Sequence, residues 1–431
     1  MAKKIGMFVW NHFTNDARVL RECSALAQDG YEVDLICIHD AKDTAMPRLE
    51  QRPEGFRVIR VSNQLKLLNR ITEAWKYIQR GIGYNAVTKL LTILLVLFGI
   101  WKAPLVIVPI LLVLLLILPS RLRSAYLLAA IIFRMVKAGM ARSYDIYHSN
   151  DLNTLPQGYL CARVFRRRKL IYDSHEVQTS RTGYNNPIYG IAERFFVKRV
   201  DVMIMENHTR AAYSRDRYGF YPEVVHNYPV PMKPEESNAV DLHALLDIPH
   251  EEPILLYQGG IQTGRGLDKL VEAVPLFERG IVVFIGDGRI KTQLQQRVQE
   301  LGLEHRVRFV PKVPVEQLLH YTKNAYLGFQ ILNNVCFNHY SASSNKLFEY
   351  MMSSVPVVAC SFPEIQKVVE NEDIGVCVDS HDPRSIAEGV NYMLNNPEHY
   401  AKMRANCLIA RDHYNWDNEK QSLLNLYRRV S

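Results

Sequence analysis

Three short stretches of this sequence contain side chains that could bind an anion or exchange protons. DSHE, at 173–176, directly follows the apolar run KLIY and offers two carboxylates and an imidazole. SSNK, at 343–346, opens a stretch with helical spacing, and the N–H groups at a helix N-terminus bind anions. GDG, at 286–288, follows another apolar run, where glycines let a ligand approach the backbone closely, although this turn is common in proteins. Their chemistry depends on the elements that position them.

Several familiar kinds of catalytic centre have no counterpart in the sequence. The 7 cysteines are scattered, without a C-x-x-C pair or a Cys/His cluster at metal-ligand spacing. No Asp-x-Asp metal site stands out, and no residue is placed as an adequate nucleophile. The first expected strand is not followed by G-x-G-x-x-G, which argues against a nicotinamide dehydrogenase. We therefore expect reduced thiols, no metal and no bound cofactor.

Short apolar strands alternate with amphipathic helices along the whole chain. The expected strands of the first half are 4–9, 32–38, 56–61, 145–149, 169–173 and 200–205. Those of the second half are PILLYQG at 253–259, IVVFIGDG at 281–288, RVRFV, YLGFQIL, VPVVAC and GVCV. A helix is expected from about Asp16 to Asp29, with Gly30 as its stop. This alternation is typical of parallel sheets covered by helices on both faces.

The strand–helix pattern restarts after the proline-rich stretch HNYPVPMKP at 226–234. We expect an α/β protein with two Rossmann-like, doubly wound domains at 1–228 and 229–412. A last segment, 413–431, would carry a helix from Trp416 to Val430 that packs back on the first domain. Ligands of such sheets bind beyond the carboxyl ends of the strands, so two facing domains would form a deep cleft.

An apolar insertion interrupts the first domain at about 65–140. Its apolar runs are Leu90–Trp101 and Leu105–Leu118, which as helices are roughly 18 and 21 Å long, against about 30 Å for a bilayer core. Strands on both sides of the insertion belong to one expected sheet, so the chain crosses a membrane an even number of times or not at all. We expect a hairpin that dips into one leaflet, kinked at Lys102–Pro104. Two full crossings, or a buried helix pair in a soluble protein, are the alternatives.

Charge and the N-terminus bear on where the protein acts. The net charge of +8 suits either nucleic acid or an anionic membrane surface, and the apolar insertion favours the membrane. MAKKIGMFVW shows no signal peptide, and basic residues flank the insertion at Arg80, Lys89, Arg121 and Arg123. We expect a protein on the cytoplasmic face of the cell membrane that does not bind nucleic acid.

Six stretches, in order, resemble family 4 glycosyltransferases, the retaining type with two Rossmann-like domains (GT-B). They are NDARVLRECSALAQDGYEVDLICI, DIYHSNDLNTLPQGYLCA, KLIYDSHE, YQGGIQTGRGLDKLVEA, FIGDG and SNKLFEYMMSSVPVVA. The resemblance covers the chain except for about 65–140. It implies sugar transfer from a nucleotide-diphosphate donor, bound mainly by the C-terminal domain, with retention of anomeric configuration. The front-face path proposed for such enzymes needs no enzyme nucleophile, because the leaving phosphate helps to deprotonate the acceptor.

The resemblance also implies a set of donor-binding residues. Those for the diphosphate and sugar are Gly260, Arg265, Ser343, Ser344, Asn345 and Lys346; those for the ribose and base are Glu349, Gly286, Asp287 and Gly288. Glu349 matches the second glutamate of an E-x7-E motif, whose carboxylate binds the ribose hydroxyls. The first glutamate is replaced by Ser341, and Gly260 stands where relatives often have arginine. Arg265 as a solvated turn residue, and Glu349 as an acid favoured by the helix dipole, are the alternatives.

Residues of the first domain would face the acceptor. Asn150 stands where many relatives have a histidine, and an amide cannot shuttle protons. The other catalytic candidates are Asp151, His175 and Glu176, and the acceptor candidates are Asp16 and Arg18. His175 as a structural hydrogen-bonding residue and Arg18 as an exposed helix residue are the alternatives.

These observations favour a membrane-associated retaining glycosyltransferase of hexosyltransferase type. Its acceptor would be a lipid-linked sugar or glycolipid at the cytoplasmic leaflet, in polysaccharide or glycoconjugate biosynthesis. The insertion, bounded by Leu90, Trp101, Leu105 and Leu118, would hold the cleft near the headgroups. The alternatives are a nucleotide-sugar epimerase or hydrolase on the same fold, and a non-catalytic scaffold of a polysaccharide assembly complex.

Overall fold

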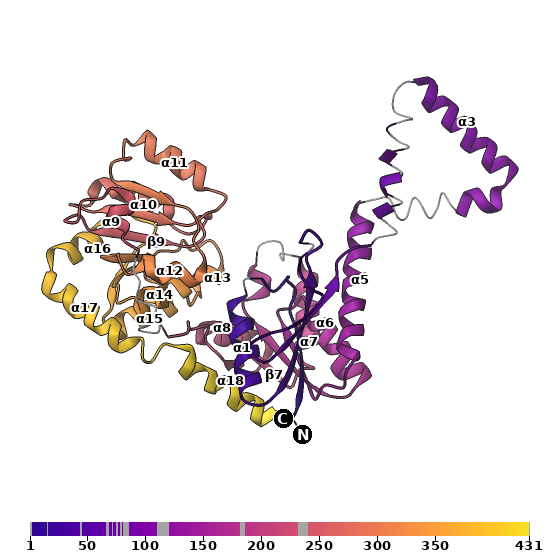
Figure 1. Ribbon diagram of the computed structural model, residues 1–431, viewed down its shortest axis with the longest axis horizontal. Coiled ribbons are helices and arrows are strands. Elements are labelled where there is room, and N and C mark those ends of the chain that lie inside the picture. Colours follow the sequence, from indigo (N-terminus) through magenta and orange to yellow (C-terminus); the bar gives the residue numbers. More distant parts are fainter. Residues whose placement is uncertain are drawn as a thin grey trace. The chain divides into compact units, whose positions relative to one another are not determined.

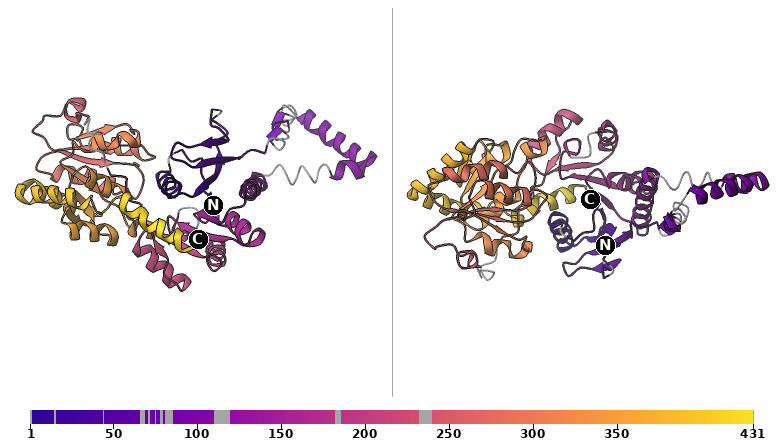
Figure 2. Two further views of the ribbon diagram at one scale, coloured as in Figure 1. Left: turned by 60° about the horizontal axis from the view of Figure 1, so that its bottom comes forward. Right: turned by 90° about the horizontal axis from the view of Figure 1, so that it is seen from above.

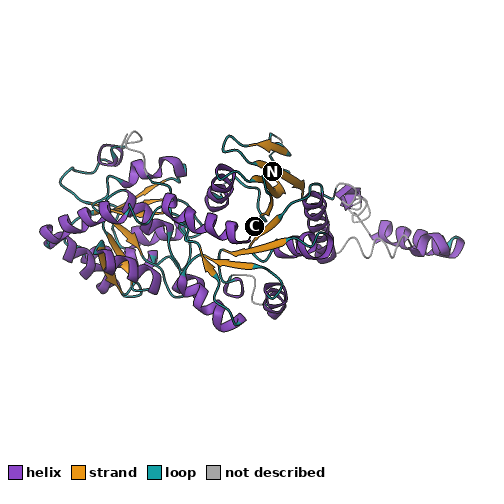
Figure 3. Ribbon diagram, turned by 90° about the horizontal axis from the view of Figure 1, so that it is seen from below, coloured by secondary structure: helices purple, strands orange, loops and turns teal. Residues whose placement is uncertain are grey.

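The computed structural model separates into two compact units, Met1–Tyr172 and Asp173–Val430. It describes residues 2–14, 16–43, 45–65, 69–70, 72–74, 76–77, 80, 86–109, 120–181, 186–231 and 240–430. The boundary between the two units falls inside a strand of the first sheet. Strands flanked by helices make up most of the described chain (Figure 3).

The first sheet has eight strands in the order β3-β4-β2-β1-β5-β6-β7-β8. The strands are β1 (Lys4–Phe8), β2 (Glu32–His39), β3 (Leu49–Gln51), β4 (Arg57–Ser62), β5 (Ile146–Asn150), β6 (Lys169–Ser174), β7 (Val202–Met205) and β8 (Glu223–Val224). The six expected strands are all present and β1 pairs in parallel with both β2 and β5. The expectation of a wholly parallel sheet was wrong at one edge, because the short strand β3 pairs antiparallel with β4.

The second sheet has six strands in the order β11-β10-β9-β12-β13-β14, and its strand pairs are parallel. The strands are β9 (Ile254–Gln258), β10 (Ile281–Ile285), β11 (Val307–Val310), β12 (Leu327–Gln330), β13 (Val357–Cys360) and β14 (Gly375–Val378). All six match expected strands. The strand order reverses between β9 and β12, and the crevice at such a switch point is where doubly wound sheets bind ligands.

Most of the helices flank these two sheets, whereas the helix at Ala86–Lys102 lies apart from them (Figure 1). In the first half they are α1 (Ala17–Gln28), α3 (Ala86–Lys102), α5 (Ser120–Met140), α6 (Leu155–Tyr159), the π-helix η1 (Leu160–Phe165), the 3-10 helix η2 (Gln178–Ser180), α7 (Pro187–Val197) and α8 (His208–Tyr218). In the second half they are α9 (Leu242–Leu246), α10 (Leu267–Ala273), the 3-10 helix η4 (Val274–Leu276), α11 (Lys291–Glu300), α12 (Val315–Thr322), α13 (Phe337–Tyr340), α14 (Asn345–Met352), α15 (Pro363–Glu372), α16 (Pro383–Asn395), α17 (Pro397–Ala410) and α18 (Trp416–Val430).

Side chains alternate between two buried clusters on the two faces of the second sheet. Tyr257 and Phe284 lie in one cluster, and Leu256 and Val283 in the other. A strand buried on both faces needs apolar residues at every position, which is why IVVFI has no polar alternation. The core therefore holds the carboxyl ends of β9 and β10 rigidly, and these ends carry the glycine turns.

Two helix predictions are confirmed at their ends. Asp16 caps α1, since its Oδ1 accepts a hydrogen bond from the Val19 N–H at 3.1 Å. The last helix runs from Trp416 to Val430, as expected. The Oε1 of its Glu419 accepts a hydrogen bond from the His226 backbone N–H at 2.8 Å, and Arg429 pairs with Glu223 at 2.9 Å. The last helix is thus fixed to the segment around β8.

The described part of the insertion contains α3 and a second helical stretch at 104–109. The helix ends at Lys102, where the kink was expected, and Figure 1 and the left view of Figure 2 show the chain bending sharply there. A Cβ added to Gly99 would lie 3.5 Å from Ile107 Cγ1, so the two arms touch just beyond the bend. Within the described residues, the helices fall short of the length or apolar content that a bilayer crossing requires. Leu118 lies outside the described residues.

All seven cysteines are free thiols, five of them buried, as expected for a reduced protein. Burial raises the pKa of Cys37 and of Cys161 to about 12. Both thiols therefore stay protonated and unreactive at neutral pH.

Candidate active site

Glycine turns at the ends of β9 and β10 form the floor of the candidate donor site. The two turns run side by side, because the Gly259 N–H donates to the Ile285 carbonyl at 2.9 Å and the Ile261 N–H to the Asp287 carbonyl at 3.0 Å. A Cβ on Gly286 would lie 2.0 Å from the Gly259 oxygen. Only glycine fits this contact, and it leaves the backbone open to a ligand.

Lys346 reaches from α14 across the β9 turn. A Cβ on Gly259 would lie 3.4 Å from Lys346 Cδ, so the lysine stem packs on the bare glycine backbone. The Nζ lies 5.6 Å from the centroid of the Tyr257 ring. The cation is therefore held directly over the glycine turn.

The charge state of Lys346 depends on its surroundings. Burial and, to a smaller extent, the positive charge of Arg265 lower its pKa from 10.5 to about 7, against the negative charge of Glu349, which raises it. Arg265, Lys346 and Glu349 thus share one electrostatic environment. Two cations that repel each other are suited to binding a diphosphate.

The N-terminus of α14 is left open to an anion. Ser344 is the N-cap residue, yet its side chain makes no capping bond to the helix. Its hydroxyl instead donates to Gln330 Oε1 at 2.9 Å, while Asn345 Oδ1 accepts from Asn227 Nδ2 at 3.1 Å. The first-turn N–H groups are therefore not covered by their own cap, and the positive end of the helix dipole adds to the two cations.

Glu349 is held in place through two neutral side chains. Its Oε2 accepts a hydrogen bond from Gln258 Nε2 at 2.7 Å, and Gln258 Oε1 accepts from Thr322 Oγ1 at 2.7 Å. Gln258 and Thr322 are fully buried. This chain fixes the carboxylate one helical turn after Lys346, where a ribose diol could be bound.

Sequence reasoning missed His339, on α13. Its Nδ1 lies 3.2 Å from the Asn333 carbonyl, and a Cβ on Gly264 would come within 2.7 Å of the ring. Burial lowers the pKa of His339, against the hydrogen bond to the Asn333 carbonyl, which raises it, and the charge of Arg265 lowers it further. The imidazole therefore belongs to the turn that carries Arg265. No spacing in the sequence pairs position 339 with this turn.

Asn150 and Asp151 lie at the end of β5. The Asn150 Nδ2 donates to the Phe8 carbonyl at 3.0 Å, and the residue is 1% exposed. Its amide thus ties β5 to β1. Asp151 has a φ of 61°, in the left-handed region that side chains other than glycine, asparagine and aspartate rarely adopt. The turn presents Asp151 beyond the strand end.

The acceptor candidates on α1 have structural partners. The Asp16 Oδ2 accepts from Asn11 Nδ2 at 2.7 Å, in addition to the cap described above. Arg18 is buried, and its Nε lies 3.0 Å from Glu22 Oε1. Arg18 was considered as a phosphate ligand or an exposed helix residue, and the exposed alternative is wrong.

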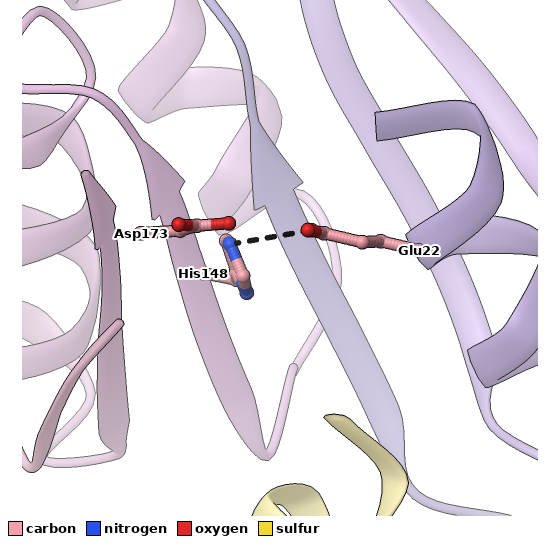
Figure 4. Close-up of side chains that lie close together, drawn as sticks. All are labelled: Glu22, His148 and Asp173. Atoms are coloured by element: carbon pink, nitrogen blue, oxygen red, sulfur yellow. Dashed lines mark ion pairs between the residues drawn. The ribbon is translucent and has the colours of Figure 1, made fainter. Parts of the chain in front are cut away.

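Behind these residues, three buried side chains converge (Figure 4). Ligand atoms of Glu22, His148 and Asp173 lie within 4.8 Å of one another, and Figure 4 shows that they come from α1 and two strands. Asp173 continues the strand that Tyr172 belongs to. Three such groups could hold a cation, but the Arg18 guanidinium already supplies a positive charge to Glu22.

His175 and Glu176 follow directly in the DSHE turn. The Nε2 of His175 lies 3.5 Å from Asp173 Oδ2, so a buried carboxylate orients the partly exposed imidazole. The Oε2 of Glu176 pairs with Arg181 at 3.3 Å. The turn therefore offers an imidazole with an orienting acid, the arrangement that general base catalysis requires.

Comparison with known proteins connects this site to a reaction class. Residues 241–407 match the family described as glycosyl transferases group 1. D-inositol 3-phosphate glycosyltransferase 1 from Catenulispora acidiphila is 26% identical over 317 residues, 68% of this chain and 74% of that protein. A D-inositol 3-phosphate glycosyltransferase from a Nocardioides species is 28% identical over 265 residues, 56% of each chain.

Solved structures share the architecture along the whole chain. Sucrose-phosphate synthase from Thermosynechococcus elongatus has a TM-score of 0.73 at 18% identity, covering 99% of both chains. Anabaena HepE in complex with UDP has a TM-score of 0.67 at 15% identity, covering 99% of this chain and 100% of that one. At these identities the likeness establishes the fold. Together these findings identify the chain as a glycosyltransferase, a transferase enzyme with a GT-B-like fold, whose residues 241–407 match the glycosyl transferases group 1.

Proposed function

We propose that this enzyme transfers a hexose, with retention, from a nucleotide-diphosphate sugar to a lipid-linked sugar or glycolipid at the cytoplasmic face of the membrane. The donor half of the proposal is supported by Lys346, Arg265 and the open N-terminus of α14, which together suit a diphosphate. Fold relatives have been solved with UDP and with UDP-glucose. Two cations and helix N–H groups can stabilise the leaving diphosphate without a metal ion.

Retention is supported by what surrounds the donor site. The side chains there are cations, amides, hydroxyls and Glu349, and Glu349 is fixed by Gln258 for ribose binding. A front-face path, in which the leaving phosphate assists the acceptor hydroxyl, uses these groups and needs no covalent sugar–enzyme intermediate. His175, oriented by Asp173, would assist in removing the acceptor proton.

The observation that carries the lipid half is the exposed apolar surface of the insertion. Leu95 is 74% exposed, Trp101 72% and Leu105 90%, and other exposed large apolar side chains there include Val87, Leu90, Leu91, Ile93, Leu94, Leu97, Phe98, Val106 and Val108. Covering such a surface is strongly favourable, at about 25 cal/mol per Å² of apolar area. A patch this continuous marks an interaction site. A lipid surface is the partner that suits it without requiring a shaped complement.

A second exposed apolar row supports the same partner. Ile188, Ile191 and Phe195 project from α7 and are at least 44% exposed. Their spacing puts them on one face of the helix, with Arg194 and Lys198 beside them. Apolar residues edged by basic ones are typical of helices that lie in the headgroup region of anionic membranes.

The proposal is tested by a donor panel of UDP- and GDP-sugars with membrane lipid extract as acceptor, read by mass spectrometry, with NMR of the product for its anomeric configuration. The variant Leu94→Ser, Leu95→Ser, Phe98→Ser, Trp101→Ser should keep donor hydrolysis but lose vesicle binding and transfer to lipid. Leu408→Ser, Ile409→Ser, which removes exposed apolar residues from α17, is the matched control. Transfer only to a soluble polyol phosphate, as the names of the relatives suggest for them, would overturn the lipid half.

A further inference from the structure

Arg210, on α8, is a buried arginine with partners in two separate segments of the second unit. It is 3% exposed. Its Nη1 donates to the His175 carbonyl at 2.6 Å, its Nη2 to the Asn338 carbonyl at 3.1 Å and its Nε to Ser341 Oγ at 3.2 Å. One planar guanidinium thus joins the DSHE turn to the end of α13.

Neighbours of Arg210 strengthen the same connection. Asn207 caps α8 and donates from Nδ2 to the Ser341 carbonyl at 2.8 Å. Asn338 exchanges two hydrogen bonds with the Val177 backbone, at 2.8 and 3.1 Å. The Tyr213 ring stacks near Phe337 at 4.6 Å. α8 and the DSHE turn therefore hold the end of α13 by contacts on several sides.

The chain continues from α13 directly into the donor site. His339 of α13 packs against Gly264 in the turn of Arg265, and Ser341 is followed by the cap of α14. Through these two connections α13 adjoins the segments that carry both cations of the site. Among the described residues, Arg210 bonds to His175, Asn338, Ser341 and Glu206, so its connection to the two cations runs through α13.

The charge around Arg210 explains why position 341 holds a serine. Glu206 already pairs with Arg210, and Ser341 is fully buried with its hydroxyl donating to the Phe337 carbonyl at 2.7 Å. A glutamate at 341 would put a second buried carboxylate beside the same guanidinium. It would draw Arg210 away from the His175 carbonyl, because an ionised acceptor outcompetes a neutral one.

We propose that Arg210 is a positioning residue of the glycosyltransferase, holding the turn of His175 and Glu176 in a fixed relation to the α13–α14 segment that binds the donor. Occupation of the donor site would then be sensed at the DSHE turn. The idea rests on the donor site inferred above. Nucleotide binding itself should not need Arg210, because Arg210 bonds to the His175 and Asn338 carbonyls, to Ser341 and to Glu206, none of which is among the proposed donor-binding residues.

The test uses Arg210→Lys, Arg210→Met and Ser341→Glu in the full chain, with Arg215→Lys as a matched control on the exposed face of α8. UDP affinity by calorimetry should change less than about threefold, while kcat for UDP-sugar hydrolysis or transfer falls about 100-fold, the scale of a 1 Å misplacement. Lysine keeps the charge but loses the planar fork, so Arg210→Lys should not rescue kcat. KM should change little.

A second readout does not depend on turnover. UDP should slow hydrogen exchange at 174–180 in the wild type and in Arg215→Lys, and this protection should be lost in the three variants while UDP still binds. Absence of protection in the wild type would overturn the proposal, as would unchanged protection in the variants. A loss of UDP affinity that matches the loss of kcat would also overturn it. If Arg210→Met does not fold, Arg210→Lys and Ser341→Glu decide the outcome.

Discussion

Replacing Lys346 with methionine should make the protein more stable and unable to bind its donor. Burial and Arg265 lower the lysine pKa from 10.5 to about 7, so the folded chain holds this proton less tightly than the unfolded chain does. One pKa unit corresponds to about 1.4 kcal/mol, which sets an upper limit of about 5 kcal/mol on the cost of Lys346 below pH 7. Water reaches part of the side chain, so we expect Lys346→Met to gain about 2–4 kcal/mol at pH 7.

The lowered pKa of Lys346 determines whether the stability of the wild type rises or falls with pH. Between about pH 7 and 10.5 the unfolded chain binds the extra proton, so the stability of the wild type rises with pH in this window. The gain of Lys346→Met over the wild type should therefore shrink to below about 1 kcal/mol at pH 10. Thermal unfolding at both pH values measures it, with Lys312→Met, at an exposed lysine, as the control.

Donor binding should show the complementary effect. A diphosphate restores the pKa of Lys346, so UDP binding takes up a proton above pH 7, and affinity should fall by up to about two orders of magnitude from pH 6 to pH 9. Calorimetry in buffers of different ionisation enthalpy detects the proton, and Lys346→Arg should bind UDP with little pH dependence. Equal UDP affinity in wild type and Lys346→Met, or a less stable Lys346→Met at pH 7, would refute the reasoning.

Four further predictions concern the same site. Glu349→Ala should weaken UDP binding by about 10-fold or more and abolish the preference for UDP over 2′-deoxy-UDP, measured by calorimetry, since a charged acceptor of the ribose hydroxyls is lost. Gly286→Ala should lower the thermal midpoint by many degrees, because its Cβ meets the Gly259 oxygen, whereas Gly302→Ala meets nothing within 4 Å and should cost only about 1 kcal/mol for its positive φ. Gly260→Arg, whose Cβ meets only Gln262 at 3.4 Å, should tighten UDP binding most at pH 8.5, where Lys346 is neutral. EDTA should leave the transfer rate unchanged, because Arg265 and Lys346 supply the positive charge; a rate restored by Mg²⁺ would contradict this.

The strands, the helices and the chemistry of individual residues could be predicted from the sequence, because each depends on residues nearby in the chain. All twelve expected strands are present, and the helix at Asp16–Asp29 follows from an acidic cap and apolar spacing. The short edge strand β3 was missed because its three residues, LEQ, carry no alternation. Lys346 and Glu349 were predicted as donor-binding residues because the stretch SNKLFEYM resembles a family motif.

Contacts between residues that lie far apart in the sequence could not be predicted. Arg210 is 35 residues from His175 and 131 from Ser341, and nothing in SRDRYG or HTRAAY distinguishes a buried arginine from an exposed one. Asn150 was predicted as a catalytic residue from its position, and the contact of its amide with the Phe8 carbonyl, 142 residues away, could not be predicted. The packing of His339 against the turn of Arg265 could not be predicted for the same reason. Such contacts follow from topology, which places distant strand ends together.

The departures from the family pattern at Gly260 and Ser341 have one electrostatic logic. Arg265 already depresses the pKa of Lys346, so a third cation at position 260 would drive Lys346 further towards neutrality. A third cation at position 260 would therefore add less than one full positive charge to the site at neutral pH. At position 341 a glutamate would compete with Glu206 for Arg210 and disturb the hydrogen bonds that hold α13. Both small residues therefore preserve charges that other side chains use: Lys346 for the diphosphate and Arg210 for the turn that carries His175.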